Sequence, residues 1–269
     1  MNRSLFTAAI IVLAVAVGLA ALMLRQSPTR TLTVFAAASL TNAFEELAEA
    51  FEAANTGVDV VFSFAGSSDL VAQLAQGAPA DVFASANNAQ MTVAVDGGRI
   101  AGNPQTFAQN RLVLLVPAEN PAQISSLQDL AKENVQLIIA APAVPVREYT
   151  NQMLDLLAAD PAYGESYREA FMANIVSEEQ NVRQVSAKIA LGEADAGIVY
   201  LSDVTPDIST QVIAIPIPDA LNTIASYPIA TVTESAHPDL AQAFVDYVLS
   251  DAGQGILQRW NFVPVRAPS

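Results

Sequence analysis

The sequence predicts an α/β protein in which helices pack on sheets. Short apolar segments alternate with amphipathic segments along most of the chain, an order typical of α/β folds, and from it we expect largely parallel sheets. The chain has 269 residues, enough for one large domain or two modest ones with a proper core. It contains no cysteine, so disulfides and thiolate metal sites do not contribute to the fold.

The first thirty residues differ in composition from the rest. An apolar run of about 20 residues, from Leu5 to Leu24, is followed by Arg25. Such a run is typical of an export signal and is also long enough to span a bilayer as a helix. We therefore expect residues 1–30 to be a signal peptide or an N-terminal membrane anchor with a tether. The rest of the chain is then exported, to the periplasm or the outer face of the cytoplasmic membrane.

The exported body is expected to begin with a strand, a helix and a second strand. An apolar run at 32–37 predicts the first strand. Apolar residues then recur at helical spacing over 40–51, which predicts a helix that begins near Ser39, with Ser39 in the N-cap position. A β-branched and aromatic run at 58–64 predicts the second strand, and a further helix follows the turn at Gly66.

The remaining elements continue this alternation. Further strands are predicted at 82–84, 112–116, 137–140 and 196–200. Further helices are predicted around 125–131, 148–158, 165–172, 182–191, 238–249 and 251–259. We find no sequence repeat and no low-complexity linker, so the α/β pattern extends almost to the end of the chain.

The charge balance excludes several classes of partner and catalyst. The chain has 27 acidic and 12 basic residues, a formal net charge of -15. Without the three arginines of residues 1–30, the body keeps 9 basic against 27 acidic residues, or about -18. An acidic surface repels a phosphate backbone, so we expect no nucleic-acid partner. The single histidine, His237, makes a histidine-based metal site or a Ser-His-Asp hydrolase hard to build.

Four junctions between an extended segment and a helix have the features of anion-binding sites. Helix N-termini present unpaired backbone N–H groups and a partial positive charge. Three junctions carry small or hydroxyl residues, and in the fourth prolines precede the helix; they lie at 36–40, 65–68, 177–182 and 142–149. Each alone is more typical of ordinary helix capping, as at Ser39 or Asn181. Only their joint presence points to a binding site.

Tyr200 is a further candidate, because it ends an apolar strand. Ligands of open α/β sheets gather at the carboxyl ends of strands. The alternative is a half-buried aromatic residue whose hydroxyl is satisfied locally. We interpret Trp260, Phe262 and His237 as packing or surface residues.

Two segments closely resemble the periplasmic molybdate-binding proteins of ABC-type transporters. They are residues 33–41, TVFAAASLT, and residues 77–86, GAPADVFASA. The resemblance continues through residues 197–203, 227–230 and 258–262. It therefore covers about residues 31–264, essentially the whole exported body.

The resemblance implies a two-lobed periplasmic-binding-protein fold, similar to type II, with the ligand cleft between the lobes. Residues 31–111 and 229–269 would form lobe I, and residues 112–228 lobe II. In this family, hydroxyls and backbone amides hold the oxygens of tetrahedral molybdate or tungstate without a basic residue. The resemblance thus implies an oxyanion ligand, with no cofactor and no direct ligands to a metal cation.

Carried over position by position, the resemblance implies five oxyanion-binding residues. Three would bind through hydroxyls and two through backbone amides: Ser39, Ser67 and Tyr200, and Val146 and Val182. The family commonly has a small residue and then glycine after its Val-Pro pair, whereas this chain has Val146 and Arg147. The arginine lacks easy access to positive φ and would place a cation near the cleft. Alternatively, Arg147 points to solvent or to an acidic partner that helps to close the lobes.

The acidic body does not preclude the binding of a dianion. Long-range repulsion is screened over about 8 Å at physiological salt, whereas hydrogen-bond donors act at contact inside a dry cleft. Hydrogen bonds to a charged partner contribute roughly 1.5–3 kcal/mol each, so about seven could supply the approximately 12 kcal/mol of nanomolar binding. Donors alone also disfavour hydrogen phosphate, whose proton needs an acceptor. Selection between molybdate and sulfate must come from the size of the cavity.

We therefore expect a solute-binding protein, not an enzyme, that passes molybdate or tungstate to a membrane permease driven by a cytoplasmic ATPase. It is expected to act as a monomer whose lobes close over the anion. Three alternatives stay open: a carrier of sulfate, phosphate or another oxyanion, an exported enzyme that uses carboxylates, and a sensory domain tethered by its N-terminal helix. The enzyme would use Glu193, Asp195 or Asp203 as acid and base.

Overall fold

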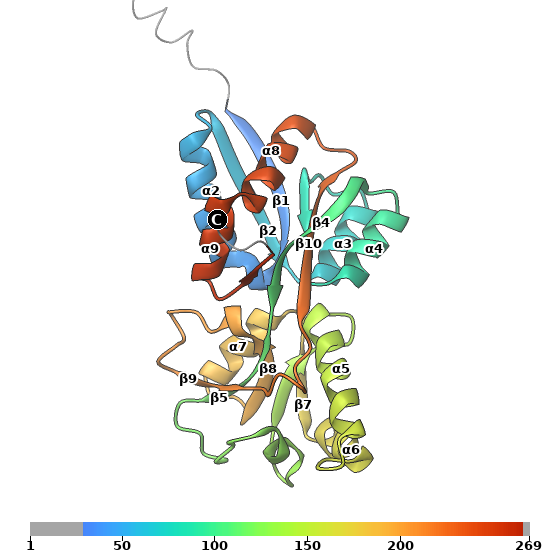
Figure 1. Ribbon diagram of the computed structural model, residues 1–269, viewed down its shortest axis with the longest axis vertical. Helices are drawn as coiled ribbons and strands as arrows, with labels where there is room; N and C mark the ends of the chain where they lie inside the picture. Colours follow the sequence, from blue (N-terminus) through green and yellow to red (C-terminus); the bar gives the residue numbers. More distant parts are fainter. Residues whose placement is uncertain (1–28, 266–269) are drawn as a thin grey trace, which may run out of the picture.

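The computed structural model describes residues 29–265, which form two α/β lobes stacked along the long axis of the molecule (Figure 1). Residues 1–28, and with them nearly all of the expected signal peptide or anchor, lie outside the described residues, as do residues 266–269. Within the described part, none of the helices combines the length and the apolar character that a bilayer span requires. The predicted α/β class is confirmed.

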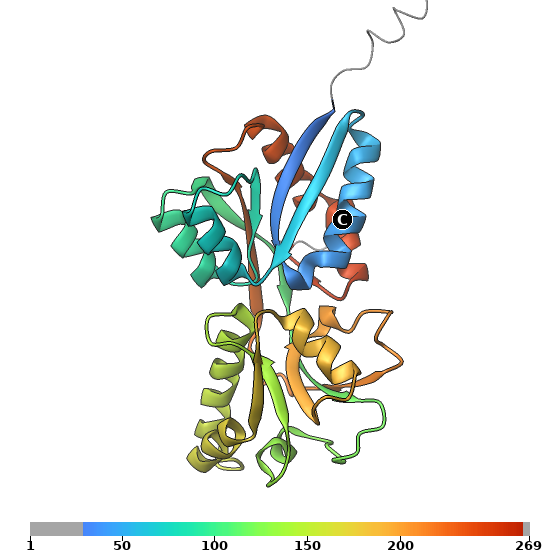
Figure 2. The same ribbon diagram turned by 180° about the vertical axis from the view of Figure 1, so that it is seen from behind.

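Lobe I is built on a six-stranded sheet in the order β11-β4-β10-β3-β1-β2. Its strands are β1 (Arg30–Ala37), β2 (Val58–Ala65), β3 (Val82–Ala84), β4 (Ile100–Asn110), β10 (Ala225–Val232) and β11 (Val263–Pro264). Helices cover both faces of this sheet (Figures 1 and 2). One face carries α2 (Thr41–Ala54), α8 (Pro238–Leu249) and α9 (Asp251–Arg259), and the other carries α3 (Ser67–Ala75) and α4 (Asn88–Asp96). The alternation along β1 explains this layering, because Leu32 and Val34 pack in one core and Phe35 in the other.

Lobe II is built on a five-stranded sheet in the order β7-β6-β8-β5-β9. Its strands are β5 (Leu112–Pro117), β6 (Leu137–Ala140), β7 (Ile175–Glu179), β8 (Ala196–Tyr200) and β9 (Val212–Pro216). The helices are α5 (Pro145–Ala159), α6 (Glu165–Ala173) and α7 (Val182–Ala190), together with the short 3₁₀ helices η2 (Leu127–Ala131) and η3 (Leu201–Asp203). Helices α5 and α7 cover opposite faces of the sheet (Figure 1). All residues of β5, β6 and β8 are buried, which explains their nearly continuous apolar sequences.

The expectation of largely parallel sheets is wrong. Strand β1 runs parallel to β2 and β3, and β6 runs parallel to β7 and β8, but the other ladders are antiparallel. The reason lies in the connections between the lobes. Strand β5 begins at Leu112, opposite Tyr200 at the end of β8, and β10 begins at Ala225, opposite Asn110 at the end of β4. Strands that enter a sheet from the cleft therefore run antiparallel to the strands that end at the cleft.

Two connections join the lobes, and Figure 1 shows them between β4 and β5 and ahead of β10. Only Arg111 separates β4 from β5, and residues 217–224 lead from β9 to β10. Strand β10 belongs to the sheet of lobe I from Ala225 onward, so it spans the second boundary implied at 228/229. The division of the chain at 111/112 and 228/229 stays a prediction.

The positions of several elements differ from the sequence prediction. Helix α2 begins at Thr41, after a 3₁₀ turn η1 (Ala38–Leu40) that contains Ser39, so Ser39 does not cap the helix. The segment predicted as a helix around 125–131 is the 3₁₀ helix η2. Elements β4, α4, β7, β9, β10 and β11 were not predicted. The sequence signal of α4 is weak because this helix buries only Met91 and Ala94.

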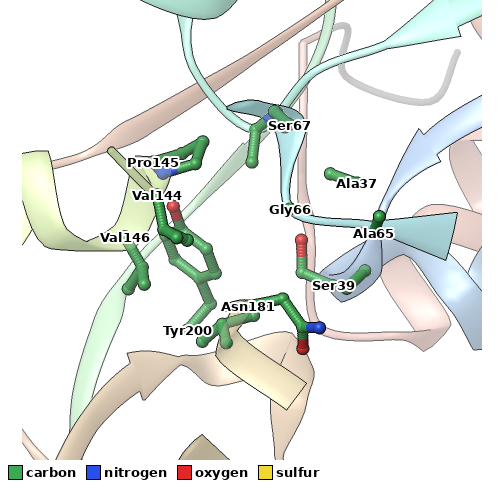
Figure 3. Close-up of a pocket in the computed structure, with 13 residues that line it drawn as sticks. Ala37, Ser39, Ala65, Gly66, Ser67, Val144, Pro145, Val146, Asn181 and Tyr200 are labelled. Atoms are coloured by element: carbon green, nitrogen blue, oxygen red, sulfur yellow. The ribbon is translucent and has the colours of Figure 1, made fainter. Parts of the chain in front are cut away.

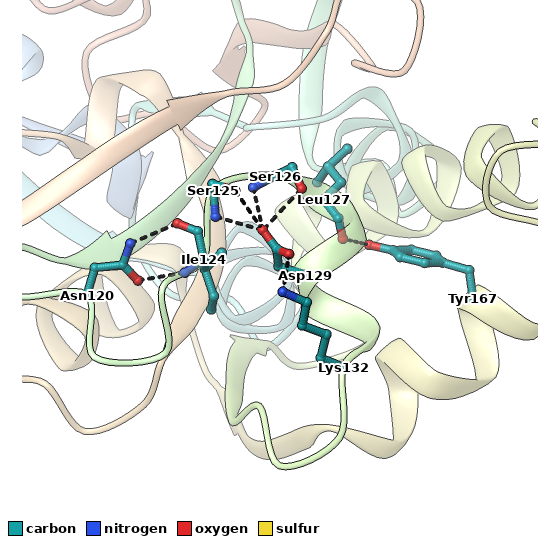
Figure 4. A network of polar contacts seen from close by, with 8 residues as sticks. All are labelled: Asn120, Ile124, Ser125, Ser126, Leu127, Asp129, Lys132 and Tyr167. Carbon is teal, nitrogen blue, oxygen red and sulfur yellow. Dashed lines mark hydrogen bonds and ion pairs between the residues drawn. The ribbon is translucent and has the colours of Figure 1, made fainter.

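A polar network fixes the loop at the start of η2, far from the other lobe (Figure 4). The Asp129 carboxylate accepts hydrogen bonds from the backbone N–H and the hydroxyl of both Ser125 and Ser126, at 2.8–3.1 Å. Lys132 Nζ lies 2.6 Å from the other carboxylate oxygen. Burial of Asp129 opposes its ionisation, but the hydrogen bonds from Lys132 and the two serines outweigh burial and lower its pKa. Asp129 therefore holds this loop as a charged group.

Candidate functional site

The five residues implied for oxyanion binding line one small cavity between the lobes (Figure 3). The cavity measures about 10 Å³ as the space open to the centre of a water molecule, which is about the room that one water molecule needs. Lobe I and lobe II contribute similar shares of its lining: Ala37, Ala38, Ser39, Ala65, Gly66, Ser67 and Ala86, and Val144, Pro145, Val146, Asn181, Val182 and Tyr200. The fold thus brings together residues up to 163 positions apart in the chain, and the ligand-binding role of the five implied residues stays a prediction.

The cavity lies where strands of both lobes end and helices begin. In lobe I, β1 leads into η1 and α2, and β2 leads into α3. In lobe II, β6 precedes α5 and β7 precedes α7. Because the strands of these pairs end at the cleft, the N-terminal ends of helices from both lobes converge on the cavity (Figure 3).

Three of these helical starts lack a side-chain cap. Their cap positions, Ala37, Gly66 and Val144, accept no side-chain hydrogen bond from the helix. The first turn of a helix leaves its N–H groups without intrahelical partners, so these groups are available to a ligand. Helix α7 differs, since the Asn181 side chain accepts a hydrogen bond from the backbone N–H of Gln184 at 3.1 Å. The capping interpretation of Asn181 is therefore confirmed.

The two serines are held by different partners. Ser67 Oγ accepts a hydrogen bond from the backbone N–H of Ala86 at 3.0 Å, so its own proton can be donated elsewhere. Ser39 Oγ lies 3.0 Å from the hydroxyl of Tyr227, and either group can donate. When Tyr227 donates, the proton of Ser39 is available to a ligand. Both serines are at most 2% exposed, which shields these hydrogen bonds from water.

Tyr200 presents a buried hydroxyl without a protein partner. The residue ends β8 and is 1% exposed, and its oxygen makes no hydrogen bond to the described protein atoms. This geometry favours a ligand-binding hydroxyl over one that is satisfied locally. Burial raises the pKa of Tyr200 well above its usual value, and nearby Tyr227, Tyr149 and Asp203 raise it further. Tyr200 thus keeps its proton at neutral pH and can act only as a neutral hydroxyl.

Arg147 does not face the cavity, contrary to each of the orientations expected for it. Its side chain is 5% exposed and lies within lobe II. One guanidinium nitrogen donates to the backbone carbonyl of Ala140 at 3.0 Å and to Glu178 Oε1 at 2.6 Å. Glu178 belongs to β7 of the same lobe, so this pair does not close the lobes. Arg147 also lies in α5 and is not among the described residues with positive φ, so the loss of glycine causes no strain there.

An ion pair that the sequence did not predict lies beside the cavity. Arg183 Nε is 2.8 Å from Asp203 Oδ1, and Asp203 Oδ2 accepts a hydrogen bond from the backbone N–H of Tyr200 at 3.2 Å. Burial raises the pKa of Asp203 to about 6, and the charge of Arg183 opposes this rise. Arg183 also donates to the carbonyl of Ser39, at 3.5 Å, from lobe II to lobe I. No local sequence pattern signalled this pair, because Arg183 and Asp203 lie 20 positions apart in the chain.

The carboxylates of the enzyme alternative are not brought together. Asp203 pairs with Arg183, whereas Asp195 accepts a hydrogen bond from the backbone N–H of Gln136 at 2.8 Å. Glu193 and Asp195 line a separate hollow of lobe II and not the cavity between the lobes. Over residues 29–265, the structure has no cluster of three or more His, Asp or Glu side chains placed to hold a metal ion.

Comparisons with known proteins agree with this architecture. A family model described as bacterial extracellular solute-binding protein matches residues 32–263. The molybdate-binding protein ModA of Mycobacterium tuberculosis is 40% identical over 233 residues, which cover 87% of this chain and 84% of the relative. ModA of Escherichia coli is 33% identical over 238 residues, covering 86% and 88%. The solved structure of the Azotobacter vinelandii periplasmic molybdate-binding protein has a TM-score of 0.73 at 23% identity, over 87% of this chain and 100% of that one. The predicted two-lobed fold is confirmed.

Proposed function

The chain belongs to the family of bacterial extracellular solute-binding proteins, and we propose that it binds molybdate as the solute-binding component of an ABC transporter. Relatives that are 40% and 33% identical over most of their length are named as molybdate-binding proteins. Their names describe binding and not catalysis, which favours the carrier over the enzyme alternative. The resemblance to molybdate-binding proteins predicted from sequence is confirmed by these relatives.

The hydrogen-bond donors that line the cavity are the observation that supports this proposal. We propose that the hydroxyls of Ser39, Ser67 and Tyr200 and the amides of Val146 and Val182 bind the oxyanion. No Lys, Arg, Asp or Glu belongs to the cavity lining. A set of hydroxyl and amide donors suits a fully deprotonated oxyanion, which offers only acceptors. It suits hydrogen phosphate less well, because the proton of that ion needs an acceptor.

The helix N-termini supply the electrostatic attraction that a basic residue supplies elsewhere. Each terminus contributes about 0.3–1 kcal/mol to a nearby anion in exposed settings, and more when partly buried. Here the helical starts of both lobes surround one buried cavity, so their partial charges act on the same ligand. Water is largely excluded, which strengthens each contact, while salt screens the acidic outer surface. The net charge of -15 is therefore compatible with a dianionic ligand.

Tungstate presents the same tetrahedral dianion, and we propose that it shares the site. Sulfate is also fully deprotonated but smaller, so its hydrogen bonds to donors on opposite lobes would be longer or fewer. Selection among these ions would then depend on the spacing of the donors when the lobes hold the ligand. Another oxyanion is the alternative cargo, and direct competition distinguishes it from molybdate.

We propose that the protein acts as a monomer in the periplasm or on the outer face of the cytoplasmic membrane. Residues 1–30 would direct its export and either be removed or remain as an anchor. Its partners would be a membrane permease and a cytoplasmic ATPase, because binding alone does not move an ion across a membrane. Closure of the two lobes over the anion would give the permease a loaded shape to recognise.

The proposal is tested by adding molybdate, tungstate, sulfate or phosphate to the protein as the cell exports it. A ligand that binds only the folded state at 100 times its Kd adds about 2.7 kcal/mol of stability, which raises Tm by roughly 5–10 °C for a chain of this size. We expect this rise with molybdate and tungstate, and calorimetric titration then gives their Kd. A rise with sulfate or phosphate alone would change the cargo. No rise with any of the four would refute oxyanion binding.

A further inference from the structure

Gly66 makes an unusually close approach between the two lobes. It lies in lobe I between β2 and α3, lines the cavity and is buried (Figure 3). A Cβ atom built on Gly66 would lie 2.6 Å from the backbone carbonyl oxygen of Gln180, which follows β7 in lobe II. Such a separation is far inside ordinary van der Waals contact. An alanine at position 66 is therefore incompatible with the observed arrangement of the lobes.

The local backbone does not require glycine at this position. Gly66 has φ -59° and ψ 138°, values that any L-residue adopts readily. The next nearest atoms to the added Cβ are Ser68 Oγ at 3.6 Å and Asp69 Oδ2 at 3.7 Å, both ordinary contacts within lobe I. Neither the turn after β2 nor the start of α3 thus excludes a side chain. The conflict arises only when lobe II is close.

Other glycines of the described chain differ in this respect. A Cβ on Gly197 would meet Ile138 and Val185, and a Cβ on Gly253 would meet the backbone at Tyr247, in each case within one lobe. Substitution of either residue would disturb the packing of its own lobe. Only at Gly66, among the described glycines, does the crowding atom belong to the opposite lobe.

The Gln180 carbonyl has little freedom to move aside. The backbone N–H of Gln180 donates to the side chain of Gln184 at 3.0 Å. The following residue, Asn181, is held by its cap to α7, and the preceding carbonyl of Glu179 accepts a hydrogen bond from the backbone N–H of Ala141 at 2.8 Å. These contacts join the segment to both its sheet and its helix. Relief of the clash must then come from separation of the lobes.

Polar contacts join the lobes on one side of the cavity, and the rings of Tyr200 and Tyr227 pack between the lobes. On one side, Asn87 Nδ2 donates to Glu148 Oε2 at 2.5 Å, and Gln90 Nε2 donates to the carbonyl of Ala143 at 3.3 Å. Asn87 and Gln90 belong to lobe I, whereas Ala143 and Glu148 belong to lobe II. These polar contacts exchange with water when the lobes part, so they offer little resistance to a separation on this side.

We propose that Gly66 is a positioning residue that permits the lobes to close over the ligand by leaving room for the Gln180 carbonyl. This inference rests on the proposed oxyanion-binding function. Ordinary contacts begin near 3.4 Å, so an alanine in ordinary contact would keep the lobes ~0.8 Å further apart at this point. The donors of the two lobes would then no longer reach the same anion together, because hydrogen bonds weaken steeply beyond about 3.2 Å.

The test compares Gly66→Ala with wild type and with Gly255→Ala as a matched control. Gly255 lies in α9 of lobe I, and its added Cβ would have no neighbour closer than 4.0 Å. We expect Gly66→Ala to weaken molybdate binding at least about tenfold, the effect of losing one hydrogen bond to a charged ligand. We expect Gly255→Ala to bind as wild type does. Without ligand, both variants should fold with a Tm close to that of wild type, since alanine fits either backbone.

Closure itself is measured as a distance between spin labels on the two lobes. Val93 on α4 and Leu156 on α5 are exposed, and the chain has no native cysteine, so Val93→Cys and Leu156→Cys can be labelled specifically. Molybdate should shorten this distance in the wild-type background and in Gly255→Ala. In Gly66→Ala the distance should stay at its ligand-free value or shorten incompletely.

Several results would overturn the inference. Equal Kd values for Gly66→Ala and wild type would do so, as would full closure of a weakly binding Gly66→Ala, which would indicate a clash with the ligand. Failure of Gly66→Ala to fold without ligand would show that glycine is required locally. If wild type binds no oxyanion, the proposed function fails. If wild type binds molybdate and the ion shortens the distance equally in wild type and Gly66→Ala, the proposed function stands and the inference about Gly66 is rejected.

Discussion

Replacing Tyr200 by phenylalanine removes one hydroxyl from the cavity and leaves the ring in place. The ring packs edge to face between Tyr149 and Tyr227, with centroid separations of 6.3 and 5.7 Å, and these contacts do not involve the hydroxyl. The hydroxyl oxygen is buried and has no hydrogen-bond partner among the described protein atoms. Tyr200→Phe should therefore weaken binding of the ligand and leave the fold largely unchanged.

The two expected effects of Tyr200→Phe differ in size and sign. Loss of a hydrogen bond to an anion costs roughly 1.5–3 kcal/mol, so Kd for molybdate should rise about 10- to 150-fold. In the absence of ligand, a buried polar atom that no protein group satisfies destabilises the fold by up to about 1–3 kcal/mol, and the substitution removes this atom. The Tm of the ligand-free protein should therefore be unchanged or higher. Weaker binding and undiminished stability together distinguish a ligand contact from a structural residue.

Calorimetric titration with molybdate and thermal unfolding without ligand measure both effects on the same preparations. Tyr247→Phe serves as the control, because Tyr247 lies on α8, where its ring packs against Phe51, away from the cavity. A Kd within twofold of wild type for Tyr200→Phe would refute the role of its hydroxyl. A lower Tm without ligand would show that the hydroxyl stabilises the fold, which is contrary to the geometry.

Three further predictions concern groups around the cavity and in lobe II. Tyr227→Phe removes the hydroxyl next to Ser39 and should raise the molybdate Kd about 2- to 10-fold in calorimetry, whereas an unchanged Kd would show that Ser39 is oriented without it. Burial raises the folded pKa of Asp203 from 3.8 to about 6, so the folded state binds more protons than the unfolded state and stability falls as pH rises through this range. Asp203→Asn should remove this pH dependence, roughly 3 kcal/mol in the free energy of unfolding measured with urea between pH 4 and 7. If the free energy of unfolding varies with pH in parallel for the two proteins, the raised pKa of Asp203 is contradicted. The folded pKa of Asp129 is lowered, so its contribution to stability is present above its unfolded pKa and is lost as pH falls through the folded pKa. Asp129→Asn should therefore lower the free energy of unfolding by about 2–3 kcal/mol at pH 7 and by less in acid. An equal loss at both pH values would argue against an ionised Asp129.

Local sequence patterns predicted the buried elements well. Strand β3 and helices α8 and α9 match the predicted bounds, because each has a strong apolar pattern or a clear start. Strands with many exposed residues were not predicted. Strand β4, for example, is exposed or partly exposed from Ile100 to Thr106, so its sequence carries no continuous apolar run.

The candidate site was predicted through a combination of local motifs and family resemblance. A small or hydroxyl residue before a helix is visible in sequence, and so is a tyrosine at the end of an apolar strand. Neither pattern states which junctions meet, since Ser39 and Tyr200 are brought together only by the packing of two lobes. The orientation of Arg147 was likewise undetermined, because a charged side chain at a helix start can point to solvent, to a ligand or back into its own lobe.

The sequence by itself determined the α/β class, the acidic surface and the helix starts that provide backbone donors, because these depend on local periodicity and composition. Only the tertiary structure decided the strand directions, the pairing of Arg183 with Asp203, the unpartnered hydroxyl of Tyr200 and the contact between Gly66 and Gln180. Each of these features depends on distances between segments far apart in the chain. Such distances are fixed by how two lobes pack, and no short stretch of sequence encodes them.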